Sequence, residues 1–304
     1  MDSLLLKKRY RPDLWAVFSW AVLGLVLGVL VYTLATLVVQ SLPAWREMGA
    51  GLLLKNDWFF RHGRFGAAGM VYGTIVVGLL ALALALPLAL GAAIWMAEYL
   101  APRSRWGVKV LIESLAAVPS VVYGLLGVLI LRRWMGEWLA PFGAWSGDTL
   151  LTGGVLLAIM ILPTLTTLTE DALQNVSQRQ RAAARGLGLT RGEVVWSVIL
   201  RQAMPGVLAA SLLGLGRALG ETIAVYLVIG RMDNQLPERL FSGTALVQPA
   251  QTLTSKLGGS ELYIALGDPV HWGAMMALCL ILLGITGLCA GASLFLNRLW
   301  TTNS

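Results

Sequence analysis

The sequence predicts an all-α, polytopic membrane protein with six transmembrane helices. The chain has 304 residues, of which 57% are hydrophobic and only 13% are charged, and its mean hydropathy is +0.72. Soluble domains carry about 25% charged residues, so this composition is too poor in charge to cover a water-exposed surface. Six apolar segments are long enough for a helix to cross a bilayer, which takes about 20 residues. These observations exclude an ordinary soluble domain.

The six expected spans follow one another with few charges inside them. The first, residues 14–45, carries no charge and is too long for a cleaved signal peptide, whose apolar region has about 7–15 residues. We therefore expect it to remain as the first membrane span. The other five are residues 65–97, 110–131, 149–169, 202–230 and 269–297.

The net charge of +7 comes mostly from basic residues that flank these spans. This placement favours an orientation signal over a nucleic-acid interface, so no nucleic-acid partner is expected. The loops on the side of the two chain ends hold more Lys and Arg than the opposite loops, which predicts that both termini lie in the cytoplasm. The expected regions are a cytoplasmic tail (1–13), a first transmembrane helix with an outer loop (14–64), a five-helix core (65–297) that includes a cytoplasmic coupling loop (170–205), and a cytoplasmic tail (298–304).

Two charged residues interrupt the fifth span, Arg217 and Glu221. A charged side chain at the centre of a bilayer costs roughly 2.5–3.5 kcal/mol, so such residues are functional candidates. Their spacing of four puts both on one face of a continuous helix. Two roles are open: the span lines a pathway for a charged solute, or the two charges neutralise each other and lock helix packing.

The coupling loop, residues 170–205, has a helix–turn–helix pattern. Alanine and arginine around Arg181 favour a helix, which Gly186 and Gly188 would end. Thr190 followed by Glu193 fits a capping box at the start of a second helix. Pro205 suits the first turn of the next span.

This loop resembles the cytoplasmic loop motif of ABC-importer permeases. That motif reads Glu-Ala-Ala, three residues, Gly, nine residues, Ile, one residue, Leu-Pro. Ala183, Ala184 and Gly188 match it, as does the later pair Val198 and Leu200, whereas Ala182 and Arg201 replace the family's Glu and Pro. The resemblance implies that Ala183, Ala184, Gly188, Thr190 and Glu193 lie in a loop that docks on an ATP-binding subunit.

Three further strings resemble the phosphate-specific importer permeases of the PstC type. They are residues 118–124, 161–172 and 216–225. The resemblance implies the type I permease fold and a location in a bacterial cytoplasmic (inner) membrane. It also implies three kinds of protein partner: a second permease of the PstA type, two ATP-binding subunits and a periplasmic phosphate-binding protein. Molybdate and sulfate permeases share the Leu-Gly-Glu core but usually continue with Phe-Gly, so Thr222 favours phosphate, with another oxyanion as the alternative.

On this resemblance, Arg217, Glu221 and Thr222 belong to the substrate pathway. Arg217 would meet phosphate, because a guanidinium matches oxyanion geometry and stays charged. Glu221 would hold Arg217 between transits or accept a proton that sulfate lacks. The threonines from Thr164 to Thr169 would either hydrate the anion or bond to carbonyls of their own helix.

No catalytic, metal or cofactor site is expected. The chain has no Gly-x-x-x-x-Gly-Lys-Ser/Thr string, so it should not bind ATP itself. Its two histidines, His62 and His271, lack metal-ligand spacing. The outer loops, 46–64 and 231–268, are either docking surfaces for a solute-binding protein or ordinary solvated loops. Two rival classes, an intramembrane enzyme and a non-transporting scaffold, have no supporting motif.

Overall fold

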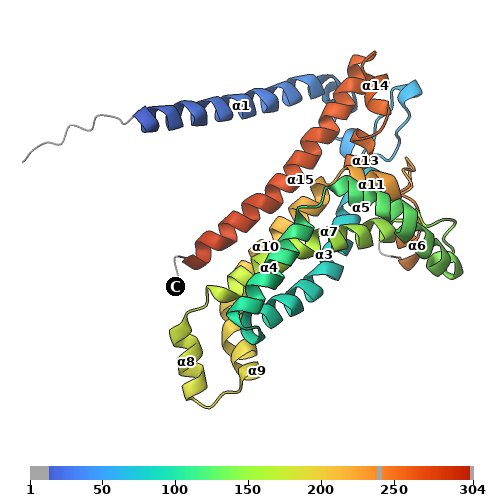
Figure 1. Cartoon of the computed structure of the whole chain (residues 1–304). Helices are drawn as coiled ribbons and strands as arrows, with labels where there is room; N and C mark the ends of the chain where they lie inside the picture. Colours follow the sequence, from blue (N-terminus) through green and yellow to red (C-terminus); the bar gives the residue numbers. More distant parts are fainter. Residues whose placement is uncertain (1–13, 238–241, 302–304) are drawn as a thin grey trace, which may run out of the picture.

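The computed structural model describes residues 14–237 and 242–301, which are mostly helical (Figure 1). Within this part, β-structure is limited to two isolated bridges, Phe59 to Arg64 and Gly230 to Ala250. The expected tail 1–13 and the last residues of the tail 298–304 lie outside the described residues. Five helices are long and apolar enough to cross a membrane, or six if one bent pair counts as a span. The five are built on α1 (Leu14–Met48), α3 (Ala68–Ile94), α7 (Leu150–Gln174), α10 (Leu200–Gly220) and α15 (Pro269–Thr301).

The third expected span, residues 110–131, is broken. Helix α4 (Pro102–Ala116) and the segment that begins with α5 (Ser120–Leu126) meet at an angle of 80°. Pro119 stands at the N-cap of α5 and has no N–H to continue the first helix. The hydroxyl of Tyr123 donates a 2.9 Å hydrogen bond to the carbonyl of Leu115, which satisfies part of the freed helix end. The chain then continues through a π-helical turn (Gly127–Leu131) into α6 (Arg132–Leu139).

The fifth expected span, residues 202–230, is also interrupted. Helix α10 ends at Gly220, Glu221 has an extended backbone (φ −71°, ψ 123°), and α11 (Ile223–Val228) follows. At its other end, α10 is continuous with α9 (Arg191–Val194) through a π-helical segment (Val195–Ile199). Pro205 therefore lies inside a helix, and its expected place in a first helical turn was wrong.

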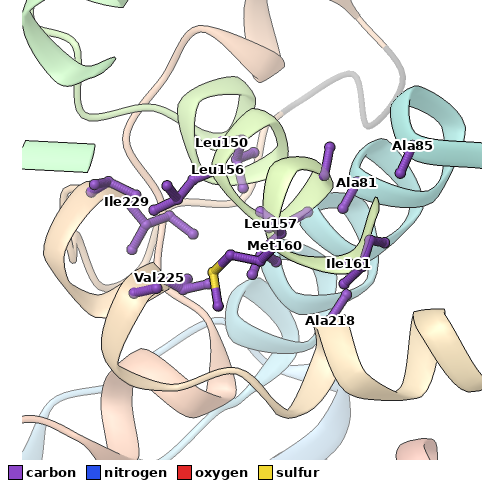
Figure 2. Packing of buried hydrophobic residues seen from close by; sticks show 14 of the residues in the cluster. Ala81, Ala85, Leu150, Leu156, Leu157, Met160, Ile161, Ala218, Val225 and Ile229 are labelled. Atoms are coloured by element: carbon purple, nitrogen blue, oxygen red, sulfur yellow. The ribbon is translucent and has the colours of Figure 1, made fainter. Parts of the chain in front are cut away.

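A stripe of small residues joins α3 to α7 at the centre of the fold. Ala81, Ala85 and Ala89 recur every four residues along α3 and are almost completely buried. Figure 2 shows Ala81 and Ala85 beside the larger side chains of α7, including Leu157 and Ile161. Small side chains let two membrane helices approach closely, so this pair forms a compact unit.

Helix α1 lies apart from this unit and, among the described residues, packs mainly against α15. Ala44 near the end of α1 is fully buried against the first turns of α15, where a Cβ on Gly273 would touch it. The Trp272 indole also donates a 2.9 Å hydrogen bond to Gln40. The rest of α1 extends away from the other helices (Figure 1), and none of its most apolar window is buried.

Candidate functional site

Arg217 lies in the last turn of α10, with its side chain exposed. The next two residues, Ala218 and Leu219, are buried, which fixes the rotation of the helix and directs Arg217 away from the core. One guanidinium nitrogen donates a 2.9 Å hydrogen bond to the Thr164 hydroxyl of α7. The other lies 3.5 Å from the carbonyl of Ala116, the last residue of α4. Arg217 therefore lies where the ends of α10 and α4 meet the side of α7.

The place of Thr164 along α7 indicates how deep in the membrane the Arg217 guanidinium lies. Helix α7 has 25 residues, and Thr164 lies about 21 Å from its first residue and about 15 Å from its last, at 1.5 Å per residue. The hydrocarbon core of a bilayer is about 30 Å thick, so the guanidinium lies well inside it if α7 spans the membrane.

Glu221 directly follows Gly220, the last residue of α10, and its ψ of 123° ends the helix there. The prediction of one continuous helix through Arg217 and Glu221 was therefore wrong. Among the described residues, Arg217 and Glu221 form no ion pair with each other or with any other side chain. Glu221 instead accepts a long, 3.4 Å hydrogen bond from the backbone N–H of Ala224. Mutual neutralisation is therefore absent from this state.

Thr222 is half-buried beside the outer segment, which we define as residues 231–268. Its methyl group would lie 2.9 Å from a Cβ added to Gly258, just after α13 (Leu253–Leu257). Its hydroxyl makes only a 3.4 Å contact with the carbonyl of Gly220. The break after α10 therefore packs directly against the outer segment.

Two of the threonines of α7 bond to carbonyls of their own helix, which is one of the two expected roles. Thr166 donates a 2.8 Å hydrogen bond to the carbonyl of Leu162, and Thr167 bonds the carbonyls of Pro163 and Thr164. These two hydroxyls are occupied by their own helix. Thr164 alone reaches another element, and the buried hydroxyl of Thr169 has no partner among the described residues.

Residues 170–205 form the helix–turn–helix expected from the sequence. Helix α8 covers Gln178–Gly186, and Gly188 follows with a φ of +85°, a conformation that favours glycine. Thr190 and Glu193 make both hydrogen bonds of a capping box.

Within the docking loop, the two matched alanines have different environments. Ala183 is exposed, whereas Ala184 is only 5% exposed and belongs to a core cluster with Leu173 and Ile199. Helix α8 lies at the end of the molecule opposite to the outer segment (Figure 1). Ala183 and Gly188 are therefore exposed at this end, while Ala184 anchors the helix.

Sequence reasoning missed two ion clusters near this end. Buried Glu170 lies 2.8 Å from Arg105 Nε and 2.9 Å from Lys109 Nζ, which links α7 to α4. Arg181 of α8 forms a buried ion pair with Glu98, which follows α3. The basic residues involved had been read as an orientation signal, and the acidic partners lie too far away in sequence for any spacing rule.

A third cluster lies in the outer segment. Lys256 is only 3% exposed and pairs with Asp233 at 2.6 Å and with Glu261. Glu261 also accepts hydrogen bonds from Trp58 at 2.6 Å and contacts His271 Nε2 at 2.9 Å. The carboxylates and Lys256 line a cavity of about 130 Å³. This cluster ties the two outer loops to the first turn of α15. In the part of the chain that the structure describes, no group of His, Cys, Asp and Glu could hold a metal ion.

Known proteins share the sequence features and the fold of this chain. The family described as "Binding-protein-dependent transport system inner membrane component" matches residues 85–291. The phosphate transport system permease protein PstC of Pasteurella multocida is 36% identical over 294 residues, covering 91% of this chain and 87% of that protein. That of Haemophilus influenzae is 32% identical over 304 residues, covering 94% and 90%.

A solved ABC importer has the same fold. The structure of a bacterial alginate ABC transporter, in complex with an alginate pentasaccharide-bound periplasmic protein, matches with a TM-score of 0.58 at 13% identity, over 94% of this chain and 96% of that chain. This identity is too low to indicate more than the fold. It confirms the expected all-α, type I permease fold. The chain therefore belongs to the binding-protein-dependent transport system inner membrane components and, within them, to the PstC type of ABC-importer permease.

Proposed function

We propose that this chain forms half of the translocation pathway of an ATP-driven phosphate importer. A second permease of the PstA type would supply the other half, two ATP-binding subunits would drive the cycle, and a periplasmic phosphate-binding protein would deliver the substrate. The relatives named as PstC support the substrate. In this proposal the chain carries out no covalent chemistry, and both of its termini lie in the cytoplasm.

The single observation that carries the proposal is the environment of Arg217. Its guanidinium is exposed, lies well inside the membrane if α7 spans it, and has only neutral partners among the described residues. An unpaired cation at that depth is costly, so an anion that visits the site would be attracted. The planar donors of arginine suit the oxygens of phosphate, and arginine keeps its charge at every relevant pH.

Glu221 and Thr222 would act beside Arg217 at the break between α10 and α11. The carboxylate of Glu221 has no cationic partner among the described residues, which leaves its oxygens able to accept a hydrogen bond from the P–OH group of monohydrogen or dihydrogen phosphate. Fully ionised sulfate has no such proton. This difference would favour phosphate over sulfate without a second fixed cation that would trap the anion.

The opposite end of the molecule would receive the ATP-binding subunit. Helix α8 and the turn at Gly188 offer an exposed surface around Ala183, next to the Thr190–Glu193 capping box. ATP-driven closure of the partner subunits would move this helix and switch the pathway between its inward-facing and outward-facing states.

The test is binding-protein-dependent, ATP-driven uptake of labelled phosphate by the reconstituted complex, with molybdate and sulfate as competitors. Arg217→Ala should lower phosphate uptake by at least about tenfold, because it removes a charge-assisted hydrogen-bond donor from the pathway. Arg133→Ala, which removes an exposed arginine of α6, is the matched control and should leave uptake unchanged. Normal uptake by Arg217→Ala would overturn the proposed pathway, and stronger competition by molybdate or sulfate would identify another oxyanion as substrate.

A further inference from the structure

Arg181 is the buried arginine of a helix whose other arginines are exposed. Helix α8 contains Arg179, Arg181 and Arg185, and only Arg181 lies in the interior, where it is 5% exposed. The helix has just one other buried residue, Ala184. Contact between α8 and the rest of the chain therefore passes mainly through these two side chains.

The guanidinium of Arg181 binds the ends of two membrane helices at once. Its Nε donates a 3.2 Å hydrogen bond to the carbonyl of Val176, and one terminal nitrogen donates a 2.5 Å hydrogen bond to the carbonyl of Leu173. Leu173 is in the last turn of α7, where carbonyls lack partners within the helix. The other terminal nitrogen pairs with Glu98, in the π-helical segment (Trp95–Tyr99) that continues α3.

The geometry makes this contact both specific and rigid. The two charged side chains are 6% and 7% exposed, so water cannot replace either partner if they separate. A planar guanidinium satisfies three acceptors only in one orientation. Any displacement of α8 must therefore carry the ends of α3 and α7 with it or break a buried ion pair.

The same helix α7 carries Thr164, the hydrogen-bond partner of Arg217. Leu173 and Thr164 are nine residues apart on one continuous helix, or about 14 Å along its axis. Because α3 and α7 pack tightly through the alanine stripe, a movement applied at Arg181 would reach this position as a movement of the whole helix pair.

We infer that Arg181 and Glu98 are a positioning pair that transmits movement of the docking helix α8 to α3 and α7, and thereby to the Arg217 site. The inference rests on the proposed function, since it assumes that α8 is moved by an ATP-binding subunit. The pair touches neither the transported ion nor ATP. Its loss should uncouple ATP hydrolysis from transport in a complex that is still assembled.

The experiment measures ATP hydrolysed per phosphate transported by the complete complex in proteoliposomes. The double variant Arg181→Met/Glu98→Leu removes both charges together, which avoids leaving one of them buried and unpaired. We expect this variant to assemble and hydrolyse ATP while the ratio of ATP to phosphate rises at least fivefold. The control variant Arg133→Met/Glu137→Leu removes an exposed pair of α6 and should keep the wild-type ratio. A wild-type ratio in the assembled double variant would overturn the inference.

A more conservative variant covers the case in which the double variant fails to assemble. Arg181→Lys keeps the charge beside Glu98 but lacks the Nε–H and the planar fork that bond the carbonyls of Val176 and Leu173. We expect this variant to assemble with a ratio between those of wild type and a fully uncoupled complex, and a wild-type ratio would overturn the inference. Failure of the proposed function would give a different result. The complex would transport another oxyanion, or its transport would not change in Arg217→Ala. In either case the ratio of ATP hydrolysed to ions transported can still be measured for the ion that is moved.

Discussion

The guanidinium of Arg217 lies 2.9 Å from the hydroxyl of Thr164, so the end of α10 is joined to the middle of α7. Fifty-three positions separate the two residues in the sequence. This hydrogen bond fixes the direction of the unpaired charge, and it connects the candidate substrate site to the helix that ends at Arg181.

Thr164→Val should lower phosphate uptake by about tenfold. The change keeps the shape of the side chain but removes the hydroxyl that orients Arg217, and a hydrogen bond to a charged group contributes about 1.5–3 kcal/mol, with the lower end fitting an exposed arginine. Uptake by reconstituted complexes checks this. Thr164→Ser should restore uptake, whereas Thr166→Val, which removes a hydroxyl bonded to its own helix, should change it less than about twofold. Equal effects of the two valine variants would contradict the prediction.

Glu221→Gln should weaken the preference for phosphate over sulfate rather than abolish uptake. The carboxylate makes no ion pair with Arg217, so its removal leaves the cation where it is. The neutral amide accepts the P–OH hydrogen bond more weakly than a carboxylate, and its N–H groups can donate to sulfate as readily as to phosphate. The measurement is uptake of labelled phosphate with increasing sulfate as competitor. Unchanged uptake together with an unchanged preference for phosphate over sulfate would contradict the proposed acceptor role of Glu221.

Gly188→Ala should reduce co-purification of the ATP-binding subunit. Gly188 has a φ of +85°, where an alanine costs roughly 1–2 kcal/mol, so the turn after α8 would shift. Gly186→Ala is the matched control, because its backbone is unstrained and a Cβ there meets no atom within 4 Å. Loss of the partner in both variants, or in neither, would contradict a specific role for the turn.

Gly73→Ala should destabilise the protein by about 1–3 kcal/mol through overpacking. A Cβ at this position of α3 would collide with the backbone carbonyl of Gln251 in the outer segment, which has no side-chain freedom to move aside. Gly91→Ala, on the same helix with nothing within 4 Å, should be neutral or slightly stabilising. Thermal unfolding of the purified complexes compares the two, and equal melting temperatures would refute the collision.

The outer-segment cluster should lose stability in acid. Burial raises the pKa of Glu261, but hydrogen bonds from Lys256 and Trp58 outweigh burial and hold it below the ordinary 4.5. The ionised carboxyl therefore stabilises the folded state above about pH 4.5, and this contribution is lost as the pH falls through the lowered pKa. Asp233, Lys256 and His271 are the other titratable groups of the cluster.

The corresponding measurement compares the melting temperatures of wild type and Glu261→Gln at about pH 7 and at about pH 3.5. The variant should melt lower at the higher pH, and the difference should shrink at the lower pH. A difference of the same size at both values would show that Glu261 does not titrate between them.

Several local features could be predicted because their causes are local. Long charge-free stretches located the membrane helices, and the Thr190–Glu193 pair and Gly188 fixed the helix–turn–helix of the docking loop. The two helix breaks were predicted as continuous spans. Pro119 and Gly220 are weak helix residues, but membrane helices tolerate both, so neither residue alone indicates that a span ends there.

Composition alone indicates the class of the molecule, because long apolar segments require membrane helices, and the resemblance of its motifs to those of known importers indicates a permease. Which polar groups meet is visible in the three-dimensional structure alone. Arg217 and Glu221, four residues apart, form no ion pair, whereas Arg217 bonds to Thr164 and Arg181 pairs with Glu98. The physical reason is that hydropathy and capping act within one or two turns, whereas the pairing of buried charges depends on how whole helices end and cross.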